Sequence, residues 1–194
     1  MGGLEMKDFR EYEKKLIEFE TSVQAGTHSV REAYDRAAKK GVSNVKFDRG
    51  GATLVGVTYN TYKKIARLYG WPEEWEGFVS MTYEEWETIV YFLFFEIQGS
   101  HIKNQSLALA LFDFYWHSGT HAVKVIQKLV NTRQDGILGP KTLAAINFND
   151  ARVLHLKLTY ERLKFLENLA GKDYTQRGFL EGWKNRISFM TFES

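Results

Sequence analysis

The sequence contains no cysteine, only two prolines and no apolar run long enough to span a membrane. Without cysteine, disulfide bonds and thiolate nucleophiles are excluded, and metal sites of the Cys/His type are disfavoured. The scarcity of proline, with no low-complexity tract and no fixed repeat, argues against linkers and solenoids. The most apolar stretch, residues 89–97, is much shorter than the roughly 20 residues of a membrane-spanning helix. It therefore predicts a buried core helix.

A strong excess of charge of one sign is also absent. Lysine and arginine number 26 against 24 aspartates and glutamates, and a net charge of +2 gives no support to a nucleic-acid partner. The amino-terminal sequence MGGLEMKDFREYEKKL has no apolar segment of the secretory kind. We therefore expect a protein that is made in the cytoplasm without a signal peptide and has no stable insertion in a membrane.

Helical periodicity is present along most of the sequence. Apolar residues recur at helical spacing, and glycine, aspartate or capping-box signals mark most helix ends. The expected helices span residues 6–24, 29–41, 59–70, 82–97, 105–116, 121–130, 141–147, 151–171 and 179–190. Aromatic residues make up 15% of the chain, and core packing explains them more simply than an aromatic-lined cleft.

One stretch departs from this pattern, the sequence KFDRGGATLVGVTY at residues 46–59. Gly50 and Gly51 suit a turn, and strand-forming residues flank them, so we expect a β-hairpin with strands at residues 45–48 and 52–59. The predicted fold is therefore mainly α, with one short β-hairpin near residues 45–59.

Glu20 lies on the apolar stripe of the first expected helix, four residues after Leu16 and three before Val23. A partly desolvated carboxyl group has a raised pKa and can act as a general acid. Two alternatives stay open at this point. Glu20 lies at the margin of the stripe and reaches water, or the pattern has no meaning, because Glu13 has the same spacing relative to Phe9.

Glu20, Asp48 and Thr53 together resemble the site of the lysozyme-like muramidases, in particular glycoside hydrolase family 108. Members typically carry Glu-Gly-Gly near the end of the first helix and then Asp-x-Gly-Gly-x-Thr-x-x-Gly-Ile/Val. The second motif is intact here as DRGGATLVGV at residues 48–57. The first is altered to Glu-Thr-Ser, and the 28 positions from 20 to 48 exceed the usual connection, so residues 21–45 form an insertion.

The second half of the chain also resembles this family. Residues 111–147 are similar to its carboxy-terminal region, a predicted peptidoglycan-binding domain, through DGILGPKT at residues 135–142, and FLEGWKNR at 179–186 is similar to its closing helix. The Asp-Gly and Gly-Pro pairs equally suit a tight turn and a helix start, whatever the protein binds. The resemblance implies a lysozyme-like fold, with a catalytic region at residues 1–100 and a helical peptidoglycan-binding region at residues 101–194 packed into the same compact unit.

The resemblance implies an N-acetylmuramidase that cuts the β-1,4 bond after N-acetylmuramic acid in the glycan strands of peptidoglycan. Glu20 would protonate the leaving oxygen, Asp48 would position a water or stabilise the developing positive charge, and the Thr53 hydroxyl would help to hold that water. The implied substrate-binding residues are Tyr59, Trp116 and His117. No metal ion and no organic cofactor is implied.

Two other functions stay open. A non-catalytic peptidoglycan-binding or secretion-activator protein would keep the scaffold with a disabled cleft, because a fold does not dictate a function. A lytic transglycosylase needs the acid but no water-activating partner, so an intact Asp48 and Thr53 count against it. The expected place of action is the cell wall or periplasm, reached by non-classical export, by release through a holin or by a dedicated secretion system.

Overall fold

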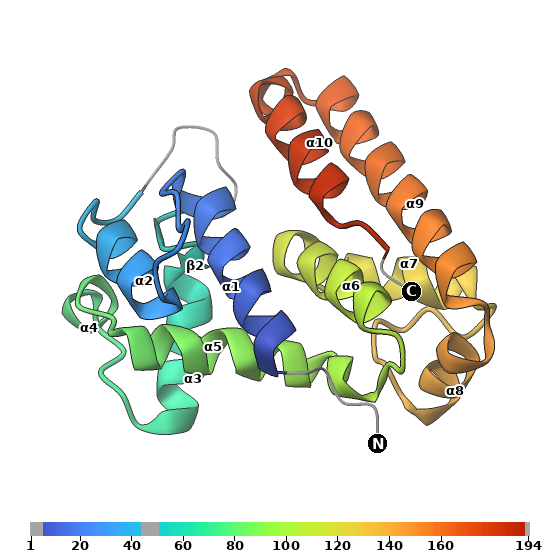
Figure 1. Ribbon diagram of the computed structural model, residues 1–194, viewed down its shortest axis with the longest axis horizontal. Helices are drawn as coiled ribbons and strands as arrows, with labels where there is room; N and C mark the ends of the chain where they lie inside the picture. The colour runs from blue at the N-terminus through green and yellow to red at the C-terminus, as the bar shows by residue number, and fades with distance from the viewer. Residues whose placement is uncertain (1–5, 44–50, 193–194) are drawn as a thin grey trace. The chain divides into compact units, whose positions relative to one another are not determined.

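The computed structural model describes residues 6–43 and 51–192, and these residues form ten α-helices, two short 3-10 helices and one two-stranded sheet (Figure 1). They fall into two compact units, an N-terminal unit up to residue 92 and a C-terminal unit from residue 93. The predicted fold class, mainly α with one small antiparallel sheet, is confirmed. Within the described ranges, none of the helices combines the length and hydropathy that a membrane crossing requires.

The described part of the N-terminal unit contains five helices and the small sheet. α1 (Met6–Thr21) packs against α2 (Val30–Ala38), and α3 (Tyr59–Tyr69) packs against α4 (Trp75–Val79). α5 (Tyr83–Glu96) completes the unit, and its last turn belongs to the C-terminal unit. Periodicity predicted all of these helices except α4, which is too short to show a periodic pattern.

Local signals set the ends of these helices. At the start of α2, the Ser29 amide donates to the Glu32 carboxylate at 2.8 Å and the Glu32 amide donates to the Ser29 hydroxyl at 3.2 Å, which makes a capping box. The predicted box at the start of α5 is confirmed, because the Thr82 amide donates to the Glu85 carboxylate at 2.7 Å. α3 ends at Gly70, whose φ of 72° is the left-handed conformation of a helix C-cap.

The core of the N-terminal unit is aliphatic and aromatic. Its fully buried side chains include those of Leu16, Ile17, Tyr62, Ile65, Trp86 and Ile89. The prediction of a buried helix at residues 89–97 is confirmed for the face that carries Ile89, Val90 and Phe94, whereas Phe95 is 56% exposed. α5 therefore covers the core with one face only.

The sheet is where the sequence-based strand assignment was wrong. β1 (Thr53–Leu54) pairs antiparallel with β2 (Val57–Thr58), so residues 52–59 fold back on themselves instead of forming one strand. The turn lies at Val55 and Gly56, with φ values of 45° and 79°. Positive φ at both central residues is the geometry that joins two twisted strands by two residues. The other expected strand, residues 45–48, lies outside the described residues.

The described part of the C-terminal unit is helical. Its helices are α6 (Gln105–Ser118), α7 (Thr120–Leu129), α8 (Pro140–Phe148), α9 (Ala151–Lys172) and α10 (Leu180–Phe189), with 3-10 turns at Gly99–His101 and Tyr174–Phe179. α6 packs against α7 and α9, and α10 runs beside α9 (Figure 1). All five helices were predicted from the sequence.

An ion cluster ties three of these helices together. Asp113 of α6 is fully buried, and the Arg162 Nη1 atom of α9 donates to its Oδ2 at 2.8 Å. Arg186 of α10 donates from Nη2 to Oδ1 at 2.8 Å and from Nε to Oδ2 at 3.0 Å, which makes a bidentate pair. Burial alone would raise the pKa of Asp113, but the two arginines outweigh it and hold that pKa well below its usual range.

Candidate active site

The structure brings Glu20 and Thr53 together in one cavity of about 300 Å³ in the N-terminal unit. The cavity lies between the end of α1, the segment that follows α2, and the hairpin. It is lined by Glu20, Thr21, Ala37, Lys40, Gly41, Val42, Ser43, Thr53, Val55 and Gly56. A helix-borne carboxyl group and a strand-borne hydroxyl group therefore face the same space, which is large enough to admit part of a ligand.

The hairpin approaches Glu20 closely through Gly56. A Cβ atom built at Gly56 would lie 2.4 Å from the Glu20 Cγ and 2.9 Å from its Cδ, closer than real Cβ contacts come. The φ of 79° at this position also favours glycine. Glycine is therefore needed at position 56 for two reasons, and one of them is the space that the Glu20 side chain occupies.

A buried indole supports the turn from the other side. The Trp86 Nε1 atom donates to the Val55 carbonyl at 3.0 Å, and the Trp86 side chain is fully buried. A β-branched residue with positive φ is uncommon because its side chain crowds the backbone. The hydrogen bond from α5 holds Val55 in that conformation and so fixes the turn that faces Glu20. Motif reasoning identified the glycine but missed Trp86, which lies 31 positions away.

Three of the four glutamates of α1 differ in their environment in a way that bears on the site. Glu13 is completely buried, and burial, reinforced by the charge of Glu87 and opposed by that of Arg10, raises its pKa to about 8. Glu18 accepts the Ala25 amide at 2.9 Å. Glu20 is half-buried and lines the cavity.

Only Glu20 of these three combines access to the cavity with a place opposite the hairpin. Burial would raise the pKa of Glu18, but its hydrogen bonds with Lys15 and the Ala25 amide outweigh this effect and lower that pKa. These bonds also use the Glu18 carboxylate to hold the loop that follows α1. Glu13 has the raised pKa of a general acid but no route to a ligand, since its side chain is 0% exposed. Glu13 and Glu20 have the same spacing relative to an apolar residue of α1, yet only Glu20 reaches the cavity.

Lys40 fixes the end of α1 beside the cavity. Its Nζ atom donates to the Thr21 carbonyl at 2.7 Å, where the last carbonyl groups of a helix have no partner within the helix. Ser43 and Thr53 exchange backbone hydrogen bonds of 2.8 Å in both directions. The segment that follows α2 is therefore bonded to both walls of the cavity. Sequence reasoning missed Lys40.

Two of the expected site residues need separate comment. Asp48 lies outside the described residues. Tyr59, at the start of α3, is half-buried, its hydroxyl donates to the Glu73 carbonyl at 3.2 Å, and its ring packs against Trp75 and Phe78 at 5.3 and 5.1 Å between centroids. Tyr59 does not line the cavity that holds Glu20, and its part in substrate binding stays a prediction.

Trp116 and His117 belong to the C-terminal unit, near the end of α6. Both are half-buried, with the Trp116 ring 6.1 Å from that of Phe112 and the His117 ring 5.3 Å from that of Trp183. Burial, followed by the nearby positive charge of Arg186, lowers the pKa of His117 to about 4. His117 is therefore neutral at physiological pH, and a substrate-binding role for both residues stays a prediction.

The DGILGPKT stretch folds as a turn around one buried amide. Gln127 of α7 donates from Nε2 to Asp135 at 2.8 Å and to the Ile137 carbonyl at 2.9 Å, and it accepts the Gly136 amide at 2.9 Å. Pro140 is the first residue of α8, as predicted. The structural interpretation of this stretch therefore accounts for its Asp-Gly and Gly-Pro pairs.

The cavity supplies a carboxyl group, a hydroxyl group and an ammonium group, from Glu20, Thr53 and Lys40. This combination can donate a proton and hold a water. Over the described ranges, histidine and acidic side chains gather nowhere in the groups of three that a metal ion needs. Acid-assisted bond cleavage is the chemistry that this set of groups can perform.

Comparisons with known proteins agree with this chemistry. Residues 37–119 match the family model described as Glycosyl hydrolase 108, and residues 121–188 match the one described as Predicted Peptidoglycan domain. The first match contains Thr53 and Gly56 but begins after Glu20. The comparison with curated proteins found no match.

Among solved structures, the chain is similar to one titled "Structure of Brucella abortus SagA". The two share 29% sequence identity with a TM-score of 0.66, and the alignment covers 82% of this chain and 89% of the other. The resemblance stated from the motifs is confirmed. The chain carries a glycosyl hydrolase 108 domain followed by a C-terminal predicted peptidoglycan-binding domain, and the first of these indicates a glycoside hydrolase.

Proposed function

We propose that the protein is an N-acetylmuramidase that cuts the β-1,4 bond after N-acetylmuramic acid in peptidoglycan, with Glu20 as the general acid. The observation that carries this proposal is the shared cavity of Glu20 and Thr53, closed by Gly56 against the Glu20 side chain. The family of the first domain supports a glycosidic bond as the target, and the second domain supports peptidoglycan as the polymer. Action at the cell wall follows from that substrate.

In this proposal the protonated Glu20 side chain donates its proton to the glycosidic oxygen as the bond breaks. The sugar then carries the positive charge of an oxocarbenium-like transition state. Thr53 helps to hold the attacking water, and Asp48 is assigned the role of activating that water or stabilising the charge. Substrate contacts are assigned to Tyr59, Trp116 and His117.

A carboxamide substitution tests the acid. Glu20→Gln keeps the side-chain shape that packs against Gly56 but removes the acidic proton, so we expect hydrolysis to fall by about 100-fold or more. Glu11→Gln is the matched control, since Glu11 is exposed on the same helix and pairs only with Lys14 at 3.2 Å among the described residues. The assay measures new reducing ends released from purified peptidoglycan.

The products separate the proposal from its alternatives. New reducing ends indicate hydrolysis, anhydro-muramic ends indicate a lytic transglycosylase, and polymer binding without new ends indicates a non-catalytic protein. Undiminished hydrolysis by Glu20→Gln would remove Glu20 from the mechanism. The anomeric configuration of the first product, followed by NMR, tests Asp48, because a water-activating base gives inversion and a nucleophile gives retention.

A further inference from the structure

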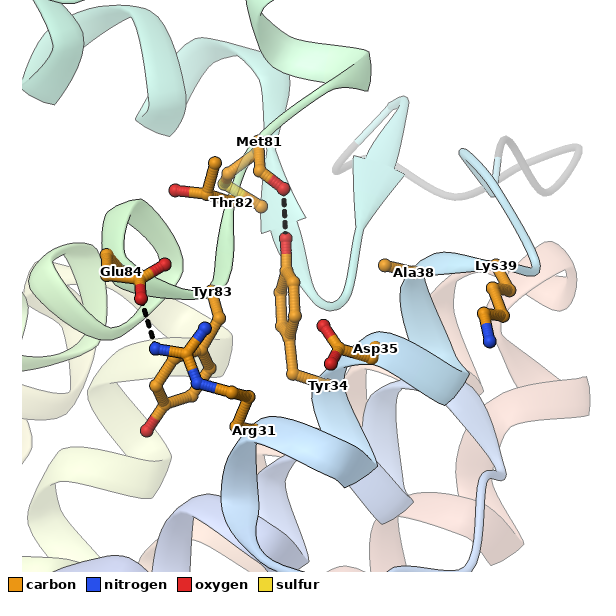
Figure 2. A pocket seen from close by; sticks show the side chains of 9 residues that line it. All are labelled: Arg31, Tyr34, Asp35, Ala38, Lys39, Met81, Thr82, Tyr83 and Glu84. Atoms are coloured by element: carbon orange, nitrogen blue, oxygen red, sulfur yellow. Dashed lines mark hydrogen bonds and ion pairs between the residues drawn. The ribbon is translucent and has the colours of Figure 1, made fainter.

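A second, larger hollow also borders α2, and it shares no lining residue with the cavity that holds Glu20. It is an open groove of about 560 Å³, which we call the α2 groove (Figure 2). One wall comes from α2 and the residue after it, and the other from the segment that leads into α5. Its lining residues are Arg31, Tyr34, Asp35, Ala38, Lys39, Met81, Thr82, Tyr83 and Glu84.

The floor of the α2 groove is fixed by buried contacts. The Tyr34 hydroxyl donates to the Met81 carbonyl, and both side chains are buried (Figure 2). The Tyr34 ring also lies 5.6 Å from the Trp86 ring and 5.8 Å from the Tyr83 ring. The two walls are therefore held at a set spacing before any ligand arrives, which lowers the entropic cost of binding.

The rim of the α2 groove carries charges of both signs. Arg31 pairs with Glu84 and lies over the Tyr83 ring at 4.5 Å. Asp35 and Lys39 are exposed on the α2 side, and no hydrogen bond or ion pair of their side chains is found with the described residues. One carboxylate and one ammonium group are therefore available to a ligand. This arrangement fits a ligand with both amino and carboxylate groups better than an anion such as a nucleotide.

At the end of α2, neighbouring residues line different hollows. Ala37 and Lys40 line the cavity that holds Glu20, whereas Ala38 and Lys39 line the α2 groove. Lys39 and Lys40 are consecutive, so their Cα atoms lie about 3.8 Å apart, and the two hollows adjoin at the end of α2. A short peptide attached to a sugar in the cavity, about 10–11 Å long for three extended residues, can therefore reach from the cavity into the groove.

We propose that the α2 groove binds the peptide stem carried by the muramic acid of the substrate, with Asp35 taking an amino group and Lys39 a carboxylate group of the stem. The inference rests on the proposed function, because only a muramic acid in the cavity brings a stem to this place. Asp35 and Lys39 set substrate preference and take no part in bond cleavage, since neither lines the cavity of Glu20.

A binding experiment tests the groove without relying on catalysis. The soluble tripeptides L-Ala-γ-D-Glu-meso-diaminopimelate and L-Ala-γ-D-Glu-L-Lys are titrated into the full chain, and backbone amide shifts are followed by NMR. We expect shifts at α2 and at residues 81–84, and we expect them to vanish in the double variant Asp35→Asn, Lys39→Gln. The absence of shifts in the unmodified protein overturns the proposal.

A kinetic experiment tests the groove during turnover. Peptidoglycan with intact stems is compared with glycan from which an amidase has removed the stems. We expect the double variant to lose about tenfold in kcat/KM on the intact polymer, the combined effect of losing two solvent-exposed charge contacts, and to keep its rate on the stripped glycan. Arg36→Gln is the control, because Arg36 is exposed on α2 but lines neither hollow.

The outcomes of the two experiments distinguish the groove proposal from the proposed function. Equal losses on both polymers, or no loss on either, overturn the stem-binding role while leaving the muramidase intact. If neither polymer is cut but the tripeptides still bind at α2, the muramidase proposal fails and the groove remains a peptide site.

Discussion

The two units of this protein each bury a carboxyl group in a helix, and they do so in opposite ways. Asp113 in the C-terminal unit is surrounded by two arginines at 2.8–3.0 Å. Glu13 in the N-terminal unit is equally buried, yet neither of its oxygens has a hydrogen-bond partner among the described residues. The pKa of Asp113 falls below its ordinary value, and the pKa of Glu13 rises to about 8. Burial alone therefore does not decide the charge of an acid, because the neighbours decide it.

The difference assigns distinct roles to the two acids. Asp113 is an anchor, because a charged carboxylate between two guanidinium groups joins α6, α9 and α10. Glu13 is a neutral side chain packed in the core near pH 7. As the pH rises further, its ionisation lowers the free energy of unfolding. Glu20 is a third case. Its side chain packs against Gly56, where no Cβ atom would fit, and it lines a cavity.

The largest expected effect comes from breaking the anchor. Asp113→Asn removes the carboxylate that pairs with Arg162 and Arg186, and losing one partner of a buried ion pair costs about 3–5 kcal/mol. We expect the free energy of unfolding of the C-terminal unit to fall by this amount in urea titrations. The control is Glu181→Gln, an exposed partner of Lys184, for which we expect at most about 1 kcal/mol. Equal effects of the two substitutions would contradict the anchoring role.

A smaller effect is expected from Gly56→Ala. This variant tests whether Gly56 matters because of the space it leaves for Glu20 or because of its backbone conformation. Gly56→Ala places a Cβ atom against the Glu20 side chain, so we expect hydrolysis to fall about tenfold or more, about 1.4 kcal/mol in the activation barrier. The control is Gly70→Ala, because Gly70 has a similar φ of 72° and open space at its Cβ position.

Both alanines adopt a left-handed conformation that costs about 1–2 kcal/mol of stability. Thermal unfolding should therefore shift in both variants, and by more in Gly56→Ala because its Cβ atom also meets the Glu20 side chain, while only Gly56→Ala loses activity. A matching loss of activity in Gly70→Ala would mean that Gly56 acts through stability and not through Glu20.

Per pH unit, the smallest expected effect concerns the neutral acid, Glu13. The folded-state pKa of Glu13 is about 8 and the ordinary value is 4.5, so between these values the unfolded chain loses a proton that the folded chain keeps. The contribution of Glu13 to stability is therefore complete below pH 4.5 and declines as the pH rises toward 8, by at most about 1.4 kcal/mol per pH unit.

Glu13→Gln cannot ionise, so its urea-unfolding free energy should decline less between pH 5 and 8 than that of the unmodified protein. The groups that face Glu13, Arg10, Glu87 and Tyr83, are retained in both proteins. Parallel pH profiles of the two proteins would show that Glu13 is ionised in the fold at neutral pH.

The helices could be predicted from the sequence because their signals are local. Apolar spacing and end signals such as Thr82 with Glu85 lie within a few residues of each other, and the structure follows them. The ion cluster could not be predicted, because Arg162 and Arg186 are 49 and 73 positions away from Asp113. A single charge within the apolar run LFDFYW was the available hint that a distant partner exists.

The candidate site was predictable only in part, for the same reason. The motif identified Thr53, and its glycines implied a turn at positions 50 and 51, of which 50 lies outside the described residues. The turn that faces Glu20 lies at Val55 and Gly56 and depends on a hydrogen bond from distant Trp86. Helical spacing could not separate Glu13 from Glu20, because burial is set by α5 and by the hairpin. Local patterns indicate which residues are candidates, and tertiary neighbours decide among them.

The arrangement of the ion cluster has a consequence for biosynthesis. The 73 positions between Asp113 and Arg186 take the ribosome about 4–15 s to translate at typical speeds. During that interval α6 is already made while its bidentate partner does not yet exist. Arg162 is made before Arg186, so the nascent C-terminal unit holds only one of the two arginines of the cluster until α10 is made. α10 is therefore the last element needed to complete the charge balance of this unit.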